Sequence, residues 1–97
     1  MEIKRIKTNA KQASNLLKLL SNEIRLLILC NLIEGKKSVS ELESIIKISQ
    51  SALSQHLAKL KAHNIIEDTR KGQLIFYSII DKNSKKILET LYKIYCK

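Results

Sequence analysis

The stretch that decides the fold is SVSELESIIKISQSALSQHLAKLKAHN, residues 38–64. Its first four residues match a capping box, in which the Ser38 side chain bonds the backbone N–H of Glu41 and Glu41 bonds back. Ser49 is a second favourable N-cap, placed before a run with regularly spaced leucines. The stretch therefore predicts two short helices separated by a tight turn.

The second of these helices has one apolar edge and one small polar face. Leu53, Leu57 and Leu60 recur at i, i+4 and i+7, which places them on one inward side. The outward side is uncharged at its N-terminal end and holds Ser51, Ser54, Gln55, Ala58 and Lys59. Such a face suits the DNA major groove, because short side chains let the backbone approach while donors and acceptors meet base edges. An ordinary amphipathic helix with a solvated face has the same pattern.

The polar residues of this helix have distinct expected contacts with DNA. Gln55 suits a bidentate pair with adenine, and Ser49 with the free N–H groups at the helix start suits a phosphate. His56 lies at the edge of the apolar stripe, so we expect it to pack or to donate to a phosphate rather than to contact a base. The predicted DNA-binding residues are Ser49, Gln50, Ser51, Ser54, Gln55, His56, Lys59, Arg70 and Lys71.

Residues 65–80, IIEDTRKGQLIFYSII, predict a β-hairpin. They lack helical spacing and are rich in β-branched and aromatic residues, with Lys71-Gly72 between the two halves. Arg70 and Lys71 make the hairpin basic. Two short helices followed by a basic hairpin are typical of a helix-turn-helix with a wing.

Three further helices complete the predicted fold. The spacing of leucines predicts one over residues 8–20, and another over residues 21–35 with Ser21 as its N-cap. The latter is apolar nearly all round, so we expect it to be mostly buried. A last helix begins at residue 81 or 83. The predicted order is α-α-α-α-β-β-α, a mainly α winged helix-turn-helix that forms a single domain over residues 1–97.

The charge of the chain favours an anionic partner. Its formal net charge is +9, which suits nucleic acid or an acidic membrane surface, although a solvated lysine-rich surface is the plainer alternative. Together with the helix-turn-helix and the wing, this charge predicts double-stranded DNA as the partner. The chain lacks the roughly 18 consecutive apolar residues of a membrane span and the apolar run of a secretory signal, so we expect a cytoplasmic protein without a membrane partner.

The few residues suited to metal or redox chemistry are Cys30, Cys96, His56 and His63. In the cytoplasm the cysteines are reduced at rest, and any disulfide is transient, catalytic or sensory. The histidines are seven positions apart without a cysteine or carboxylate beside them, which is poor spacing for metal ligands. We therefore predict no metal, no cofactor and no enzymatic activity.

Three segments give the chain a resemblance to the ArsR/SmtB family of bacterial winged-helix repressors. They are LLKLLSNEIRLLIL (16–29), SVSELESIIKISQSALSQHLAKLKAHNII (38–66) and GQLIFYSI (72–79). The block SQSALSQHLAKLK (49–61) within the second is the most specific. The resemblance implies a homodimer joined through the first and last helices. It also implies that the two recognition helices bind an inverted-repeat operator, one DNA turn apart. The alternative is that both terminal helices simply cover the core of a monomer.

The cysteines point to one branch of this family. Metal-sensing members carry cysteines at the start of the third helix or Asp and His ligands on the last helix. In this chain the start of the third helix holds Ser38, Val39 and Ser40, and the last helix has no histidine. Cys30 in LILCNL and Cys96 in LYKIYC resemble the dithiol, metal-independent branch. That branch implies a sensor of reactive sulfur species, in which persulfides bridge the two cysteines within a subunit and the dimer releases its operator.

The residues alone leave alternatives open. Cys30 taken singly is an ordinary core residue and Cys96 an ordinary surface residue. The chain is then a constitutive or peroxide-responsive regulator with incidental cysteines, a small thiol enzyme, or a non-specific architectural DNA protein. Sensing requires the last helix to fold back onto the second. In that case we expect Cys96 to react first and Cys30, the less exposed thiol, to resolve.

Overall fold

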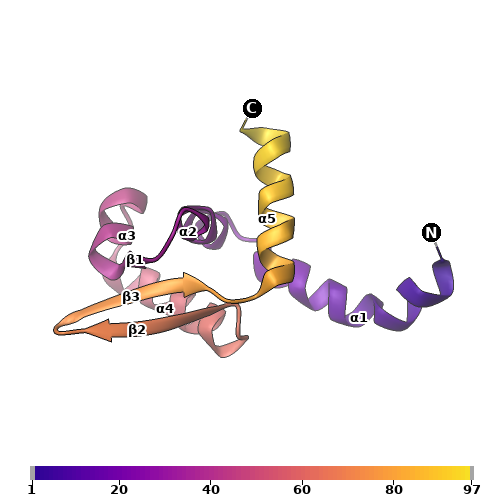
Figure 1. The fold of residues 1–97 in the computed structure, drawn as a ribbon, viewed down its shortest axis with the longest axis horizontal. Helices are drawn as coiled ribbons and strands as arrows, with labels where there is room; N and C mark the ends of the chain where they lie inside the picture. Colours follow the sequence, from indigo (N-terminus) through magenta and orange to yellow (C-terminus); the bar gives the residue numbers. More distant parts are fainter. Residues whose placement is uncertain (1, 97) are drawn as a thin grey trace.

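The computed structural model describes residues 2–96, which form five α-helices and a three-stranded antiparallel sheet. The elements follow in the order α1 (Ile3–Leu20), α2 (Glu23–Ile33), β1 (Lys37–Ser38), α3 (Val39–Ile46), α4 (Gln50–Ala62), β2 (Ile66–Lys71), β3 (Leu74–Ile79) and α5 (Lys82–Tyr95). Figure 1 shows α3 and α4 beside the long hairpin β2-β3, while α1 and α5 extend away from this centre in different directions. The predicted winged helix-turn-helix is confirmed, with one more strand than expected.

The helix-turn-helix forms through the caps that the sequence predicts. Ser38 Oγ accepts from the backbone N–H of Glu41 at 3.1 Å, and the Glu41 carboxylate accepts from the backbone N–H of Ser38 at 3.0 Å. Ser49 caps α4 by accepting from the N–H of Ala52 at 3.2 Å. Between the two helices Lys47 has a φ of 60°, the left-handed conformation that few residues other than glycine adopt. This single residue turns the chain from α3 into α4.

The sheet has the strand order β1-β3-β2. β2 and β3 form the predicted hairpin, and Gly72 takes a φ of 62° in its turn, which costs glycine little because it has no Cβ. β1 pairs with the other edge of β3, placing Lys37 opposite Tyr77 and Ser38 opposite Phe76. The sequence did not predict β1, because two residues are too few to carry a periodic pattern.

One continuous core holds these elements together. It buries Leu19, Leu20, Ile28, Leu29, Leu32, Leu42, Leu53, Leu57, Leu60, Ile65, Ile66 and Leu88. The three leucines of α4 are among them, as the spacing predicts, and they fix which face of α4 remains outside. No helix within residues 2–96 combines the length and hydrophobicity needed to cross a bilayer.

The expectation that α2 is mostly buried holds for only part of the helix surface. Arg25 and three apolar residues of this helix are buried, but Leu27 is 42 % exposed and Cys30 is exposed as well. The neighbouring elements cover only part of the helix, so composition overstated its burial. The N-cap is also shifted by one position, because the Asn22 side chain rather than that of Ser21 accepts from the backbone N–H of Arg25, at 3.0 Å.

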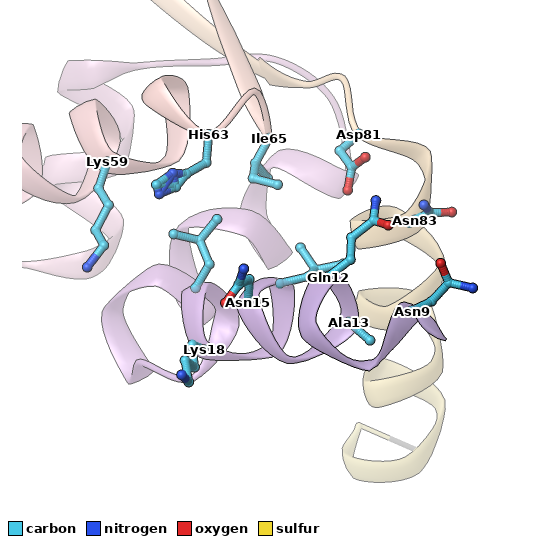
Figure 2. Close-up of a pocket in the computed structure, with 12 residues that line it drawn as sticks. Asn9, Gln12, Ala13, Asn15, Lys18, Lys59, His63, Ile65, Asp81 and Asn83 are labelled. Atoms are coloured by element: carbon cyan, nitrogen blue, oxygen red, sulfur yellow. The ribbon is translucent and has the colours of Figure 1, made fainter. Parts of the chain in front are cut away.

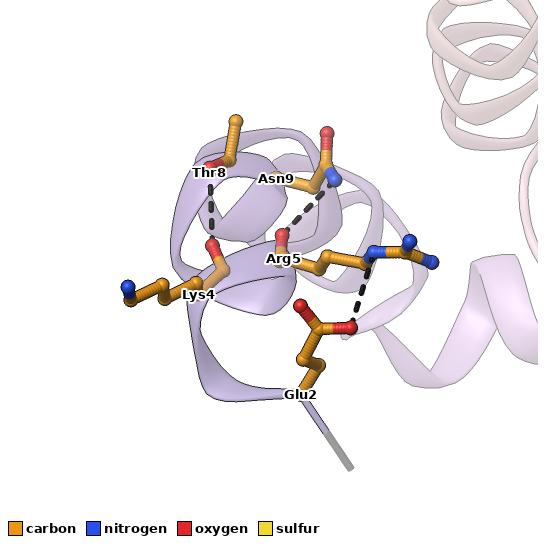
Figure 3. A network of polar contacts seen from close by, with 5 residues as sticks. All are labelled: Glu2, Lys4, Arg5, Thr8 and Asn9. Atoms are coloured by element: carbon orange, nitrogen blue, oxygen red, sulfur yellow. Dashed lines mark hydrogen bonds and ion pairs between the residues drawn. The ribbon is translucent and has the colours of Figure 1, made fainter.

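α1 begins at Ile3 rather than at residue 8. Figure 3 shows the contacts of its first turns: Thr8 and Asn9 donate to the carbonyls of Lys4 and Arg5, at 3.0 and 3.1 Å, and Arg5 Nε lies 3.4 Å from a Glu2 carboxylate oxygen. Lysine and arginine are good helix formers. The helix therefore extends through residues that carry no buried stripe, which is why the leucine pattern did not reveal them.

Candidate DNA interface and dithiol site

The outward face of α4 presents the predicted base-contacting residues to solvent. Gln50, Ser51, Ser54 and Gln55 are all exposed. Ser49 is exposed beside them, with its Oγ 3.4 Å from that of Ser51. The first turn of α4 has no acidic residue, so its free N–H groups and the positive end of the helix dipole face solvent without a competing carboxylate. This end of α4 thus has the polarity and shape that suit base edges and a phosphate. We refer to these five residues as the reading face.

Two of the other predicted residues on α4 lie elsewhere. His56 is half-buried, and its Nδ1 lies 3.4 Å from Nη1 of Arg25 on α2. Burial, and then the charges of Arg25 and Lys59, lower the pKa of His56. Lys59 is exposed but lines a groove beside α1. His56 therefore faces the protein, whereas the reading face points away from it.

The groove beside Lys59 has a volume of about 870 Å³ and lies between α1, the end of α4 and the start of α5. Figure 2 shows its mainly polar lining, with Gln12 and Asn15 from α1, His63 after α4, and Asp81 before α5. It is open to solvent. The groove brings together none of the predicted DNA-binding residues other than Lys59.

The wing carries the predicted basic residues and one that sequence reasoning missed. Arg70 and Lys71 are exposed on β2. Lys36, in the turn before β1, reaches the same surface: its Nζ lies 5.5 Å from the centroid of the Phe76 ring. The close approach of the Lys71 side chain, and then its charge, lower the pKa of Lys36. Two ammonium groups held this close favour an anion between them, as a DNA phosphate would be.

Lys61 forms an ion pair within the protein. Lys61 Nζ at the end of α4 lies 2.8 Å from Asp68 Oδ1 on β2. This pair lowers the pKa of Asp68 and raises that of Lys61. It ties the recognition helix to the base of the wing, so the two candidate DNA-contacting elements are joined directly.

The two cysteines lie where α5 packs against α2. Cys30 is on α2, and Cys96 is the C-cap of α5, with its backbone N–H donating to the Tyr92 carbonyl at 2.8 Å. Both cysteines are exposed. The sequence predicted that Cys30 is the less exposed of the two, and burial does not separate them in this way. The thiol of Cys30 is still partly desolvated by its neighbours, which raises its pKa, and the charge of Cys96 raises it further. α5 thus packs against α2, as the sensing hypothesis requires.

A small groove opens beside Cys30. It has a volume of about 280 Å³ and is lined by Cys30, Ile33, Glu34, Glu89, Tyr92 and Lys93. A small reagent can thus approach Cys30 from between the two helices. In the part of the chain that the structure describes, no three His, Cys, Asp or Glu side chains are grouped closely enough to hold a metal ion.

The comparisons with known proteins agree with this geometry. Residues 22–68 match the family described as bacterial regulatory protein, arsR family. The chain is 40 % identical over 96 residues to the transcriptional activator HlyU of Vibrio cholerae, an alignment that covers 99 % of this chain and 89 % of that protein. The chain belongs to the ArsR family.

Solved structures of ArsR-type regulators have the same fold. The structure of reduced HlyU from Vibrio cholerae N16961 superposes with a TM-score of 0.91 at 40 % identity, over 96 % of this chain and 98 % of that one. The transcriptional repressor BigR from Xylella fastidiosa superposes with a TM-score of 0.93 at 38 % identity, over 100 % and 99 % of the two chains. These relatives are regulators rather than enzymes, and this chain is a DNA-binding transcriptional regulator of the same type.

Proposed function

We propose that the protein is a homodimeric transcriptional repressor that releases an inverted-repeat operator when Cys30 and Cys96 are oxidised or bridged by reactive sulfur species. The observation that carries this proposal is the placement of Cys30 on α2 and of Cys96 at the end of α5, two helices that pack against each other. After burial, the charge of Cys96 is the second cause that raises the pKa of Cys30. The two histidines lie away from each other, with His56 on α4 against Arg25 and His63 directly after α4 in the groove beside α1.

Unpartnered apolar side chains on the terminal helices support a dimer. Along α1, Ile3, Ile6 and Leu17 are 67, 49 and 55 % exposed; on α5, Tyr92, Ile94 and Tyr95 are 59, 56 and 79 % exposed. Both helices extend beyond the core (Figure 1). Burying such groups against a second copy gains about 25 cal/mol per Å² of apolar surface. A symmetric pair would also present two copies of α4 to one face of DNA.

The arrangement suggests how thiol chemistry reaches the DNA. A thiolate that attacks the outer sulfur of a donor persulfide becomes a cysteine persulfide and releases the donor thiol. A second donor persulfide is the oxidant: it transfers its outer sulfur to the cysteine persulfide and releases a second donor thiol. The other cysteine then attacks the middle sulfur of the extended chain, hydrosulfide leaves, and the two cysteines are joined through one additional sulfur. The bridge ties the end of α5 to α2, and because α5 is also an expected dimer helix, it shifts one subunit against the other and misplaces the two copies of α4.

The raised pKa of Cys30 favours one order of reaction between the two cysteines. The thiolate is the nucleophile, and a raised pKa keeps Cys30 in its thiol form. Cys96 remains the expected first nucleophile, with Cys30 resolving through the groove beside it. This order stays a prediction.

Single-cysteine variants test the proposal. Operator binding is measured by fluorescence anisotropy before and after treatment with glutathione persulfide, for the wild type and for Cys30→Ser and Cys96→Ser. We expect release only in the wild type. Release from both variants would indicate a regulator whose cysteines are incidental. Release by peroxide alone would indicate a peroxide sensor. Sustained turnover of the sulfur donor would indicate a thiol enzyme, and equal affinity for operator and random duplexes an architectural protein.

A further inference from the structure

Arg25 is a charged residue that the core encloses. It lies on α2 and is only 8 % exposed. Its Nε donates to the Leu19 carbonyl at 2.5 Å, and its Nη2 donates to the Lys18 carbonyl at 3.4 Å. Both acceptors belong to the last turn of α1, where carbonyl groups lack partners within the helix. Arg25 thus anchors the end of α1.

The same guanidinium reaches the recognition helix. Its Nη1 lies 3.4 Å from His56 Nδ1, and His56 follows Gln55 of the reading face directly along α4. One side chain therefore joins the end of α1 to the helix that carries the reading face. The contact requires a neutral imidazole, with Nδ1 as acceptor. Protonation of His56 turns Nδ1 into a donor that faces the N–H donor of Arg25. It also gives the imidazole a positive charge next to that of the guanidinium.

We propose that Arg25 and His56 form a positioning link that sets the orientation of α4 relative to α1. The inference rests on the proposed function, in which α1 contributes to the dimer interface. The link then fixes each recognition helix relative to that interface, and so relative to the partner's recognition helix. His56 acts as a positioning residue through Arg25, not as a ligand of a DNA phosphate.

The surroundings of His56 determine the effect of pH on this link. The charged groups that act on it are Arg25 from α2 and Lys59 from α4 itself, and both are cationic. Burial, and then these two charges, hold the pKa of His56 below the ordinary value of 6.5. As pH falls through that lowered pKa, His56 gains a proton and the link is lost. Operator affinity should therefore fall on acidification. A phosphate ligand would behave in the opposite way, because its protonated form would bind DNA more tightly.

The test measures the affinity of the full chain for operator and random duplexes between pH 5.5 and 8.0, at constant ionic strength. The wild type is compared with His56→Gln, which keeps an acceptor toward Arg25 but does not titrate, and with the control His63→Gln. We expect wild-type operator affinity to fall below pH 6.5, by about tenfold for each unit of pKa difference between free and bound protein. The His56→Gln variant should not show this fall in operator affinity below pH 6.5. The His63→Gln control should show it.

Arg25 variants separate positioning from folding. Arg25→Lys keeps the charge, but its single ammonium group does not span the α1 carbonyls and His56 together. We expect the ratio of operator to random-duplex affinity to fall at least about tenfold, or about 1.4 kcal/mol. A folding defect alone lowers the active fraction and leaves this ratio unchanged.

Three outcomes are decisive. Operator affinity that rises on acidification in the wild type but not in His56→Gln would make His56 a phosphate ligand and overturn the link. Identical pH profiles for the wild type and His56→Gln would also overturn it. A wild type that does not distinguish operator from random DNA would instead refute the proposed function.

Discussion

Replacing Gln55 by alanine is the most direct perturbation of the reading face. Gln55 is exposed on α4, next to core residues that fix the orientation of the helix. Its removal leaves those residues untouched, and alanine is a slightly better helix former than glutamine. The thermal midpoint of unfolding should therefore stay the same, so that any change in DNA binding reports on recognition.

The expected magnitude follows from the contact that Gln55 would make. A bidentate pair between glutamine and adenine contributes about 1–3 kcal/mol of discrimination. A dimer makes this contact in both half-sites, and well-separated positions are roughly additive. The expected loss is thus about 2–6 kcal/mol, which is at least about thirtyfold in operator affinity. Affinity for random duplexes should not change, because phosphates rather than bases supply that binding.

Anisotropy titrations with operator and random duplexes at one salt concentration measure this loss. Gln12→Ala is the matched control, since it removes an exposed glutamine from α1, away from the reading face. Equal weakening of both duplexes by Gln55→Ala would refute base recognition by this residue. An unchanged operator affinity would refute the placement of α4 in the major groove.

Three further predictions concern the cap, the wing and the thiol. Ser38→Ala opens the capping box of α3 and should cost about 1 kcal/mol, which lowers the thermal midpoint by about 4–8 °C; an unchanged midpoint in calorimetry would contradict this. Lys71→Gln should reduce the slope of log affinity against log salt by about 2 per dimer while sparing sequence preference. An unchanged slope would remove Lys71 from the phosphate contacts. Because burial and then Cys96 raise the pKa of Cys30, its alkylation by iodoacetamide should keep increasing above pH 9.0, and Cys96→Ser should accelerate it; mass spectrometry measures both, and a plateau below pH 9.0 would contradict the raised pKa.

The elements that could be predicted are those with local chemical signals. The capping box at Ser38, the N-cap at Ser49 and the leucine spacing of α4 each depend on residues within one or two turns, and the structure contains all three. The hairpin followed from composition and its glycine in the same way. Local signals were sufficient because the hydrophobic period and the caps indicated the same boundaries.

What could not be predicted depends on contacts between distant residues. Lys36 and Lys71 meet only because β1 adds to the free edge of β3. No local pattern marks Arg25 as buried, yet it lies enclosed against α1 and α4. Cys30 sits in an apolar run but remains exposed, since burial depends on which sides of α2 the other helices cover. Hydrophobic periodicity describes one helix or strand at a time, so it does not predict contacts between different elements.

The central claim is that chemistry at the Cys30–Cys96 pair controls DNA binding. Intact-mass and peptide mass spectrometry after treatment with persulfide, hydrogen peroxide or glutathione disulfide, with operator binding measured on the same samples, tests it most directly. We expect a link between Cys30 and Cys96 within one subunit, carrying additional sulfur and formed with persulfide, in the same fraction of protein that has released the operator. Release without this link, or a linked protein that still binds the operator, would contradict it.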